Sequence, residues 1–294
     1  MFTPFAFVKQ KAVAGGGGDP YPLTTAYLAA TGITGSTNIT ALQDLEGDLS
    51  TYGLTSKVLA LYPMIGGTIG TVKYNFMNPQ DTDAAYRLVQ SGSTPTITMN
   101  GVAGDGLDYP YPAVLINPSF NTNVPLSSIA PLDNHFISYN VTSPAANQVN
   151  YPAESGVQPI TIGSYYITLQ LNSYHYGNNT TSHDNPANNS SVATFGANST
   201  ALGFYAGTRT STTSNLMYRN KGGSKTTNVN ASSASGLSYT GGATRYLTIT
   251  TAGRAGSERR IAFYSYGTGL TESELDNYYT AVQAFQTTLG RQVT

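Results

Sequence analysis

The chain has 294 residues, of which 39% are hydrophobic and only 10% are charged, and its formal net charge is −1. An ordinary globular domain carries about 25% charged residues, so glycine, tyrosine and small polar residues fill much of this sequence. The near-neutral charge gives no electrostatic reason to expect a nucleic-acid or membrane partner. The absence of cysteine excludes thiolate metal sites and thiol catalysis.

The first 18 residues predict an apolar arm on a flexible linker. Aromatic and aliphatic side chains come first, two lysines follow, and Gly15–Gly18 then form a glycine run. This order is the reverse of a secretory signal, and no apolar run approaches the roughly 18 residues of a membrane span, so we expect synthesis in a host cytoplasm. We interpret the arm as an anchor in a larger assembly; the alternative is a strand that folds back onto its own domain. The anchoring side chains are Phe2, Phe5, Phe7 and Val8.

Two short helices are predicted next. The first spans Pro22–Ala30 and ends near Gly32, and the second is capped by Thr37 or Asn38 and continues to Gly53. One face of the second helix is apolar. It consists of Ile39, Leu42, Leu45, Leu49 and Tyr52.

From Lys57 onward, short apolar runs between Gly, Pro, Asn and Ser residues predict strands. These runs begin with VLALYPMIGG from Val58 and continue at 86–89, 113–116, 136–139, 165–171, 202–205, 216–218 and 246–249. The pattern indicates an antiparallel sandwich or barrel. No second series of helices alternates with the strands, so a parallel α/β sheet is not expected.

The last 35 residues predict a buried strand, a glycine turn and one amphipathic helix. The strand is Ile261–Tyr264 and the turn contains Gly267. Thr271 and Glu274 fit a capping box, in which the N-cap hydroxyl and the carboxylate three residues later each accept a backbone N–H. Gly290 suits a left-handed C-terminal cap. The apolar face of the helix consists of Leu275, Tyr278, Tyr279, Val282, Phe285 and Leu289.

Several of these segments, taken in order, resemble one family. They are the glycine run before Asp19-Pro20, KVLALYPMIGGT, KYNFMNPQDTDAAYRLV, IAFYSYGTGL and YYTAVQAFQTTLGRQV. The segments are similar to bacteriophage-associated structural proteins of the tail, fibre or spike type, often from phages of Bacteroidota. The resemblance lies in residues 15–90 and 258–294. It implies a mainly β fold: an antiparallel, concanavalin A-like (laminin-G-type) jelly-roll sandwich with two short N-terminal helices and a C-terminal amphipathic helix.

The same resemblance, together with the glycine run, divides the chain into three regions. Residues 1–18 are the virion-anchoring arm and linker, residues 19–56 a helical lead-in, and residues 57–294 a lectin-like β-sandwich domain.

Acidic residues do not form the pattern of a glycan hydrolase, which needs two carboxylates flanking the scissile bond. The nearest cluster is Glu272, Glu274 and Asp276, but it lies at the start of a helix and Glu274 is used as a cap. The acidic residues between 44 and 48 are interpreted as a solvated helix face rather than as metal ligands. We therefore expect no enzymatic activity.

Two further acidic pairs are weighed as metal sites. Asp81 and Asp83 precede Arg87, and we expect turn formation and pairing with that arginine rather than Ca²⁺ binding. Asp105 and Asp108 are interpreted in the same way, with a loop Ca²⁺ site as the weaker alternative. No other cofactor is expected.

Four tyrosines near turns are the candidate glycan contacts, since a phenol can stack on a sugar and hydrogen-bond to it; core or loop packing is the alternative. They are Tyr109, Tyr111, Tyr174 and Tyr176.

Composition and resemblance together predict a virion surface protein, a fibre or spike that adheres to host-surface glycan. A purely architectural capsid decoration or spike protein without a ligand is the alternative, and a glycan hydrolase is a third. Expected partners are other virion proteins, bound through the arm, and further copies of the chain, because repeated weak contacts gain from avidity.

Overall fold

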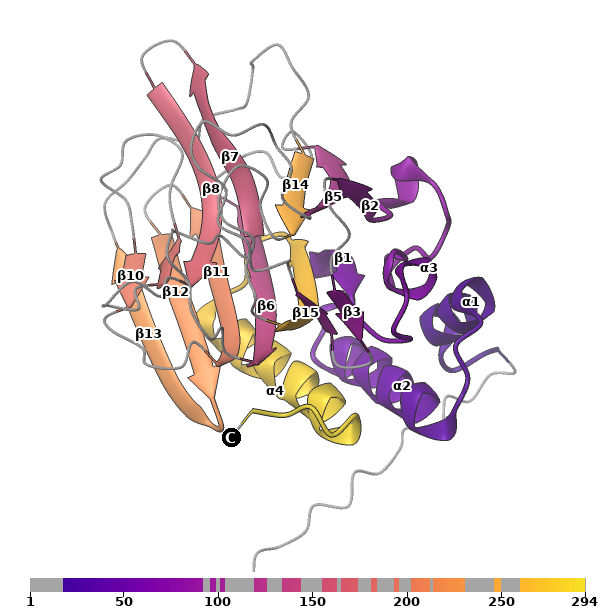
Figure 1. The fold of residues 1–294 in the computed structure, drawn as a ribbon. Helices are drawn as coiled ribbons and strands as arrows, with labels where there is room; N and C mark the ends of the chain where they lie inside the picture. The colour runs from indigo at the N-terminus through magenta and orange to yellow at the C-terminus, as the bar shows by residue number, and fades with distance from the viewer. Residues whose placement is uncertain are drawn as a thin grey trace, which may run out of the picture.

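The structure, a computed structural model, describes residues 18–91, 96–98, 101–103, 119–125, 134–143, 155–162, 165–173, 181–183, 193–195, 202–211, 214–230, 246–249 and 260–293. Within these residues the chain forms two antiparallel sheets with helices beside one of them (Figure 1). The prediction of a mainly β, antiparallel protein is confirmed. A concanavalin A-like jelly roll, the finer assignment, stays a prediction, as does the division into three regions.

Four α-helices are described: α1 Pro22–Thr31, α2 Ser36–Thr51, α3 Ile69–Val72 and α4 Glu272–Thr288. Two 3-10 helices accompany them, η1 Thr55–Lys57 and η2 Asp83–Ala85. The two predicted N-terminal helices and the C-terminal helix are confirmed, but the predicted cap of α2 at Thr37 or Asn38 is wrong: α2 begins at Ser36, with Gly35 as its N-cap residue and no side-chain cap. α4 begins with the predicted capping box, in which Thr271 Oγ1 accepts from Glu274 N–H at 3.3 Å and Glu274 Oε2 accepts from Thr271 N–H at 2.9 Å.

The acidic residues of α2 are not all solvated, contrary to the prediction. Asp44 is exposed, but Glu46 and Asp48 are buried. The Glu46 carboxylate accepts the backbone N–H groups of Leu23 at 3.0 Å and Thr24 at 2.9 Å. It therefore caps α1, whose N-cap residue supplies no side-chain hydrogen bond, and places a negative charge at the positive end of the helix dipole.

The first sheet has eight strands in the order β13-β12-β11-β6-β15-β4-β3, with β1 also paired to β15. Its strands are β1 Val58–Tyr62, β3 Thr96–Thr98, β4 Gly101–Ala103, β6 His135–Ser143, β11 Gly203–Ser211, β12 Ser214–Lys221, β13 Ser224–Asn230 and β15 Arg260–Gly267. Gly267 ends β15 beside Val58, where a Cβ would overlap the Lys57 carbonyl oxygen. Glycine is therefore needed there for close strand approach.

The second sheet has seven strands in the order β10-β9-β8-β7-β14-β5-β2. They are β2 Val89–Ser91, β5 Ser119–Pro125, β7 Ser155–Ile162, β8 Tyr165–Ser173, β9 Thr181–His183, β10 Ala193–Phe195 and β14 Tyr246–Ile249. The predicted strand at 86–89 is wrong for its first residues: Tyr86 has a φ of 62° after η2, and the strand begins only at Val89. The predicted strand at 113–116 lies outside the described residues.

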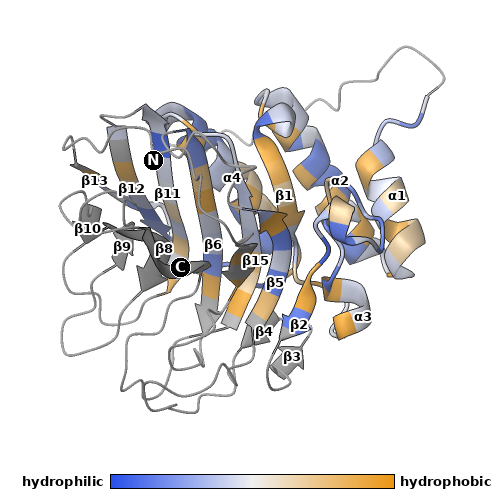
Figure 2. Ribbon diagram, turned by 90° about the horizontal axis from the view of Figure 1, so that it is seen from above, coloured by the Kyte–Doolittle hydropathy of each residue, from blue (hydrophilic) through white to orange (hydrophobic). Residues whose placement is uncertain are grey.

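Alternating side chains of the first sheet build two cores, as expected for a strand buried on both faces. In β6, Ile137 and Tyr139 point between the sheets and pack with Phe120 of β5 and Ile249 of β14. Phe136, on the opposite face, packs against the helices. Figure 2 shows the resulting hydrophobic and hydrophilic bands along the strands beside α2 and α4. The layers are thus helices, first sheet and second sheet.

α4 and α2 share the helical core. Tyr278, Val282 and Phe285 of α4 are fully or almost fully buried beside Leu45 and Leu49 of α2. Burial of each such side chain contributes roughly 1.5–3 kcal/mol relative to exposure. The two ends of the described chain are therefore held in one layer, on the face of the first sheet that points away from the second.

Candidate functional site

The predicted anchor and ligand residues fall outside the part of the chain that the structure describes. This applies to the arm (Phe2, Phe5, Phe7, Val8), the calcium candidates (Asp105, Asp108) and the glycan tyrosines (Tyr109, Tyr111, Tyr174, Tyr176). Those assignments stay predictions. The candidate site consists of the polar side chains that the described residues bring together.

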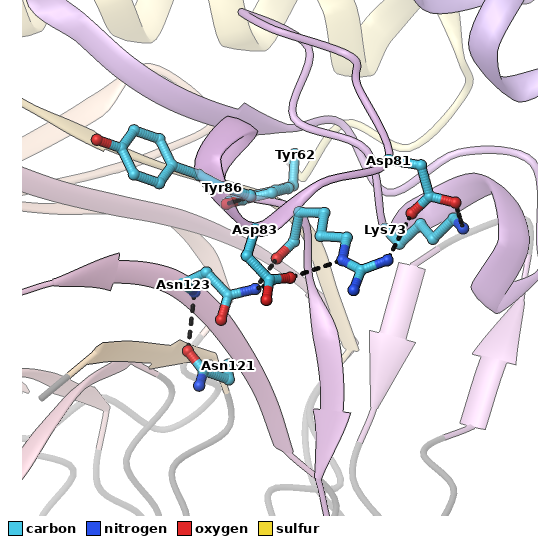
Figure 3. A network of polar contacts seen from close by, with 8 residues as sticks. Tyr62, Lys73, Asp81, Asp83, Tyr86, Asn121 and Asn123 are labelled. Atoms are coloured by element: carbon cyan, nitrogen blue, oxygen red, sulfur yellow. Dashed lines mark hydrogen bonds and ion pairs between the residues drawn. The ribbon is translucent and has the colours of Figure 1, made fainter. Parts of the chain in front are cut away.

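An exposed polar network joins the loop before β2 to strand β5 (Figure 3). Arg87 lies at its centre, with Nε donating to Asp83 Oδ1 at 2.8 Å and Nη1 donating to Asp81 Oδ1 at 3.0 Å. Lys73 Nζ forms an ion pair with the other oxygen of Asp81. Asn123 of β5 donates through Nδ2 to Asp83 Oδ1 at 3.1 Å and to the Arg87 carbonyl at 3.0 Å. The predicted pairing of Asp81 and Asp83 with Arg87 is confirmed.

The charges of this network stabilise one another. The hydrogen bond from Lys73, followed by that from Arg87, holds the pKa of the Asp81 carboxyl below its usual range. Hydrogen bonds to Asp81 and Asp83 raise the pKa of Arg87. Two carboxylates neutralised by two cations are poor Ca²⁺ ligands, because the metal would have to displace both. The network is therefore suited to holding the loop against the sheet.

Buried polar side chains fix the same loop from behind. Asn75 is fully buried, and its Oδ1 accepts the N–H groups of Leu61 at 3.0 Å and Met77 at 3.1 Å. The hydroxyl of Tyr62 donates to the Tyr86 carbonyl at 2.5 Å, and burial raises the pKa of that phenol. The loop is consequently a fixed support for the edge of the second sheet.

The acidic cluster at the start of α4 is likewise engaged. Glu274 forms an ion pair with Lys57 at 2.6 Å; partial burial works to raise its pKa, but hydrogen bonds from Lys57 and Thr271 outweigh burial and lower it. Glu272 and Asp276 both bind Lys225 of β13 at 2.8 Å. These carboxylates therefore fasten η1, which directly precedes β1, and β13 to the helix, which is a structural role.

Sequence reasoning missed the contact between α4 and the β12–β13 hairpin. The Tyr218 hydroxyl donates to Asp276 Oδ1 at 3.0 Å, and Gly223 N–H donates to the Tyr279 hydroxyl at 3.3 Å. Lys225 lies over the Tyr218 ring at 5.6 Å from its centroid. Strands are recognised in a sequence by apolar residues, and β13, with the sequence SKTTNVN, is almost entirely polar. The apolar pattern of the chain therefore does not indicate this hairpin.

Two absences hold for the described residues only. No group of three or more His, Cys, Asp or Glu side chains there is arranged to hold a metal ion. No helix among them is long and apolar enough to cross a membrane. A Ca²⁺ site at Asp105 and Asp108 remains a prediction.

No protein-family model matches the chain, and no curated protein matches it. Solved structures match at low identity. The full-length tailspike protein 2 of an Escherichia coli O157:H7 bacteriophage is 11% identical with a TM-score of 0.41, over 65% of this chain and 27% of that one. A Shewanella oneidensis MR-1 protein of unknown function is 12% identical with a TM-score of 0.38, over 72% and 86%. A Trypanosoma rangeli sialidase is 8% identical with a TM-score of 0.38, over 82% and 39%.

The chain therefore spans about a quarter of the tailspike that it matches. All these TM-scores are below 0.5, so the likenesses identify neither a fold family nor a function. Phage tailspikes are among the matching structures, and no family model confirms the resemblance to phage-associated proteins.

The expectation that the chain is not an enzyme is contradicted and is withdrawn. The matching structures include the enzymatically active domain of tailspike protein 2, the sialidase and a GH43 protein from Bacillus licheniformis. The expectation rested on the cluster at residues 272–276, whose carboxylates are engaged in the structure.

Proposed function

We propose that this chain is a phage virion surface protein, a fibre or spike, that attaches to glycan on the host surface. The observation that carries the proposal is which segments of the chain form the helical layer and which form the two sheets. All described helices come from the two segments that resemble phage structural proteins, residues 15–90 and 258–294. The intervening residues 91–257 supply every strand of the second sheet except β2, and every strand of the first sheet except β1 and β15. Binding residues are commonly carried by strands and loops that a packed scaffold holds in place, and here the helical layer is such a scaffold for the strands of residues 91–257.

The chemistry of the intervening segment supports a glycan ligand. It is rich in Asn, Ser, Thr and Tyr and poor in charge, and such side chains exchange hydrogen bonds with sugar hydroxyls while phenols stack on sugar rings. We assign the contacts to two pairs of tyrosines, Tyr109 with Tyr111 and Tyr174 with Tyr176. The arm, through Phe2, Phe5, Phe7 and Val8, would join the protein to other virion proteins.

Binding of the full-length chain to an array of bacterial surface glycans tests the proposal. We expect one glycan class to bind, and alanine substitution of either tyrosine pair to weaken binding at least tenfold. Tyr21→Ala, next to α1 on the helical side, is the matched control and should leave binding unchanged. A chain that binds no glycan, or variants that all bind alike, would contradict adhesion. Shortened glycan products would show hydrolysis instead.

Immunogold electron microscopy of purified virions, with antibody against residues 91–257, tests the location. Label on the tail tip or on sparse fibres supports attachment to the host. Even label over the head, combined with no glycan binding, supports the architectural alternative. Unlabelled particles would refute a virion surface protein.

A further inference from the structure

The four strands that end the two sheets differ in length. β2, β3 and β10 have three residues each, whereas β13, at the margin of the first sheet, has seven (Figure 1). Short end strands are one way in which proteins prevent their edges from pairing with another chain. β13 is the exception.

Another strand of the first sheet has its free edge covered. Beside β1, the Leu61 N–H donates to Asn75 Oδ1 at 3.0 Å and the Leu61 carbonyl accepts from Phe76 N–H at 2.8 Å. For β13, the described residues provide no such cover: β12 pairs with one edge, and β10, although close, is hydrogen-bonded to β9. Because bonded pairs alternate along an antiparallel ladder and Ser224 closes the two-residue turn with Lys221, the outward backbone donors and acceptors of β13 are those of Lys225, Thr227 and Val229.

β13 also lacks the usual protective features. It contains no proline, and its register with β12 runs without a bulge from Ser224 to Asn230. Its one charge, Lys225, is turned toward α4 and neutralised by two carboxylates. Val229 is 60% exposed, the most exposed large hydrophobic side chain described. Thr and Val favour strand pairing.

We propose that β13 pairs antiparallel with β13 of a second copy, which joins the two first sheets across a two-fold axis. Side chains directly opposite in such a pair lie on the same face of the sheet, and Lys225, Thr227 and Val229 share the face toward the helices. A register centred on Thr227 sets Lys225, Thr227 and Val229, whose backbone groups point outward, against the partner strand. It places Val229 against the aliphatic stem of the partner's Lys225 and Thr227 against its own copy. The inference does not rest on glycan binding.

Cysteine cross-linking of the full-length chain tests this register, because the protein has no cysteine of its own. In Thr227→Cys the two sulfur-bearing residues would face each other, with Cα atoms about 4.5–5.5 Å apart, which a disulfide can span. In Val229→Cys they would be displaced by four residues, roughly 13 Å along the strands. Val229→Cys is the control. Because Val229 is more exposed than Thr227, random collision between molecules would cross-link Val229→Cys faster than Thr227→Cys.

We expect mild oxidation to convert Thr227→Cys to a species of twice the 31.0 kDa chain mass at least five times faster than Val229→Cys. Adding Val229→Lys, which sets lysines opposite each other, should slow cross-linking at least fivefold. Adding Val89→Lys, at the exposed valine of the other end strand β2, should not. Circular dichroism would verify that both added lysines leave the fold intact.

The opposite results would overturn the proposal. Equal rates for the two cysteines indicate collision, and faster linking of Val229→Cys indicates another register. No linking of Thr227→Cys would mean that the edge is unpaired, or that another occupant such as the apolar arm covers it. Sensitivity to Val89→Lys rather than to Val229→Lys would move the interface to β2.

Discussion

Replacing Arg291 with methionine removes the side chain that fastens the C-terminal segment to the β1 and β15 region. Arg291 is 6% exposed, and its guanidinium donates to the carbonyls of Met64 at 2.9 Å, Pro63 at 3.1 Å and Ala262 at 2.9 Å. Its Nε donates to Gln286 Oε1 at 2.9 Å. A single buried fork therefore satisfies acceptors from three parts of the chain.

The expected loss of stability is set by the buried carbonyls of Met64, Pro63 and Ala262, which lose their donor in this variant. Each buried carbonyl that loses its donor costs about 1–3 kcal/mol. The Ala262 carbonyl keeps a long contact with Gln286 Nε2 at 3.4 Å, so it counts least. Burying methionine avoids the dehydration of a charge, which offsets part of the loss, and its unbranched chain fills similar space. We expect Arg291→Met to lower the free energy of unfolding by about 2–4 kcal/mol, a large share of the roughly 5–15 kcal/mol typical of folded proteins.

Urea unfolding followed by far-UV circular dichroism and tyrosine fluorescence measures this loss, since the chain has no tryptophan. Arg291→Lys keeps the charge but not the planar fork, so an intermediate loss is expected. Arg87→Met, in the exposed network, should shift the midpoint much less. A loss below about 1 kcal/mol for Arg291→Met would refute the reasoning.

Three further predictions concern α4 and acid stability. Thr271→Ala removes the N-cap hydroxyl that accepts from Glu274 N–H, and should cost about 1 kcal/mol in urea unfolding, whereas Thr271→Ser should retain the cap; equal losses would contradict capping. Tyr278→Phe removes a buried hydroxyl that donates to Ser265 Oγ at 2.6 Å, and should cost about 0.5–1.5 kcal/mol; an unchanged midpoint would show that the bond contributes nothing net. The pKa values of Asp81 and Glu274 are lowered in the fold, so their stabilisation is complete above the unfolded values of about 4 and is lost as pH falls through the folded ones. Unfolding midpoints should therefore drop between about pH 5 and pH 3, less steeply in Asp81→Asn, and identical pH profiles would contradict this.

Features encoded within a few residues were predictable from the sequence. The capping box of Thr271 and Glu274 depends on residues three apart, and Gly290 has the φ of +66° expected of a left-handed cap. The pairing of Arg87 with Asp81 and Asp83 is also local.

Features that depend on a distant partner were not predictable. No residue near Glu46 in the sequence indicates that its carboxylate caps α1, because the capped residues lie 22 and 23 positions earlier. The polar strand β13 is likewise defined by its distant neighbours, β12 and α4, and not by its own sequence. The turn at Tyr86 follows from a fixed loop rather than from its strand-favouring sequence, since its carbonyl accepts from the buried Tyr62 hydroxyl. The candidate glycan and anchor residues were assigned from composition and resemblance, and their test lies in binding experiments.

The pairing of β1 with β15 has a consequence for biosynthesis. Tyr62 is opposite Tyr264, so β1 waits for roughly 200 further residues before its partner exists. At typical translation rates of about 5–20 residues per second this takes on the order of 10–40 s. The apolar faces of α2 and β1 are without α4 and β15 for that time, which makes the nascent chain a substrate for holding chaperones and makes co-expression of such chaperones a way to raise the soluble yield.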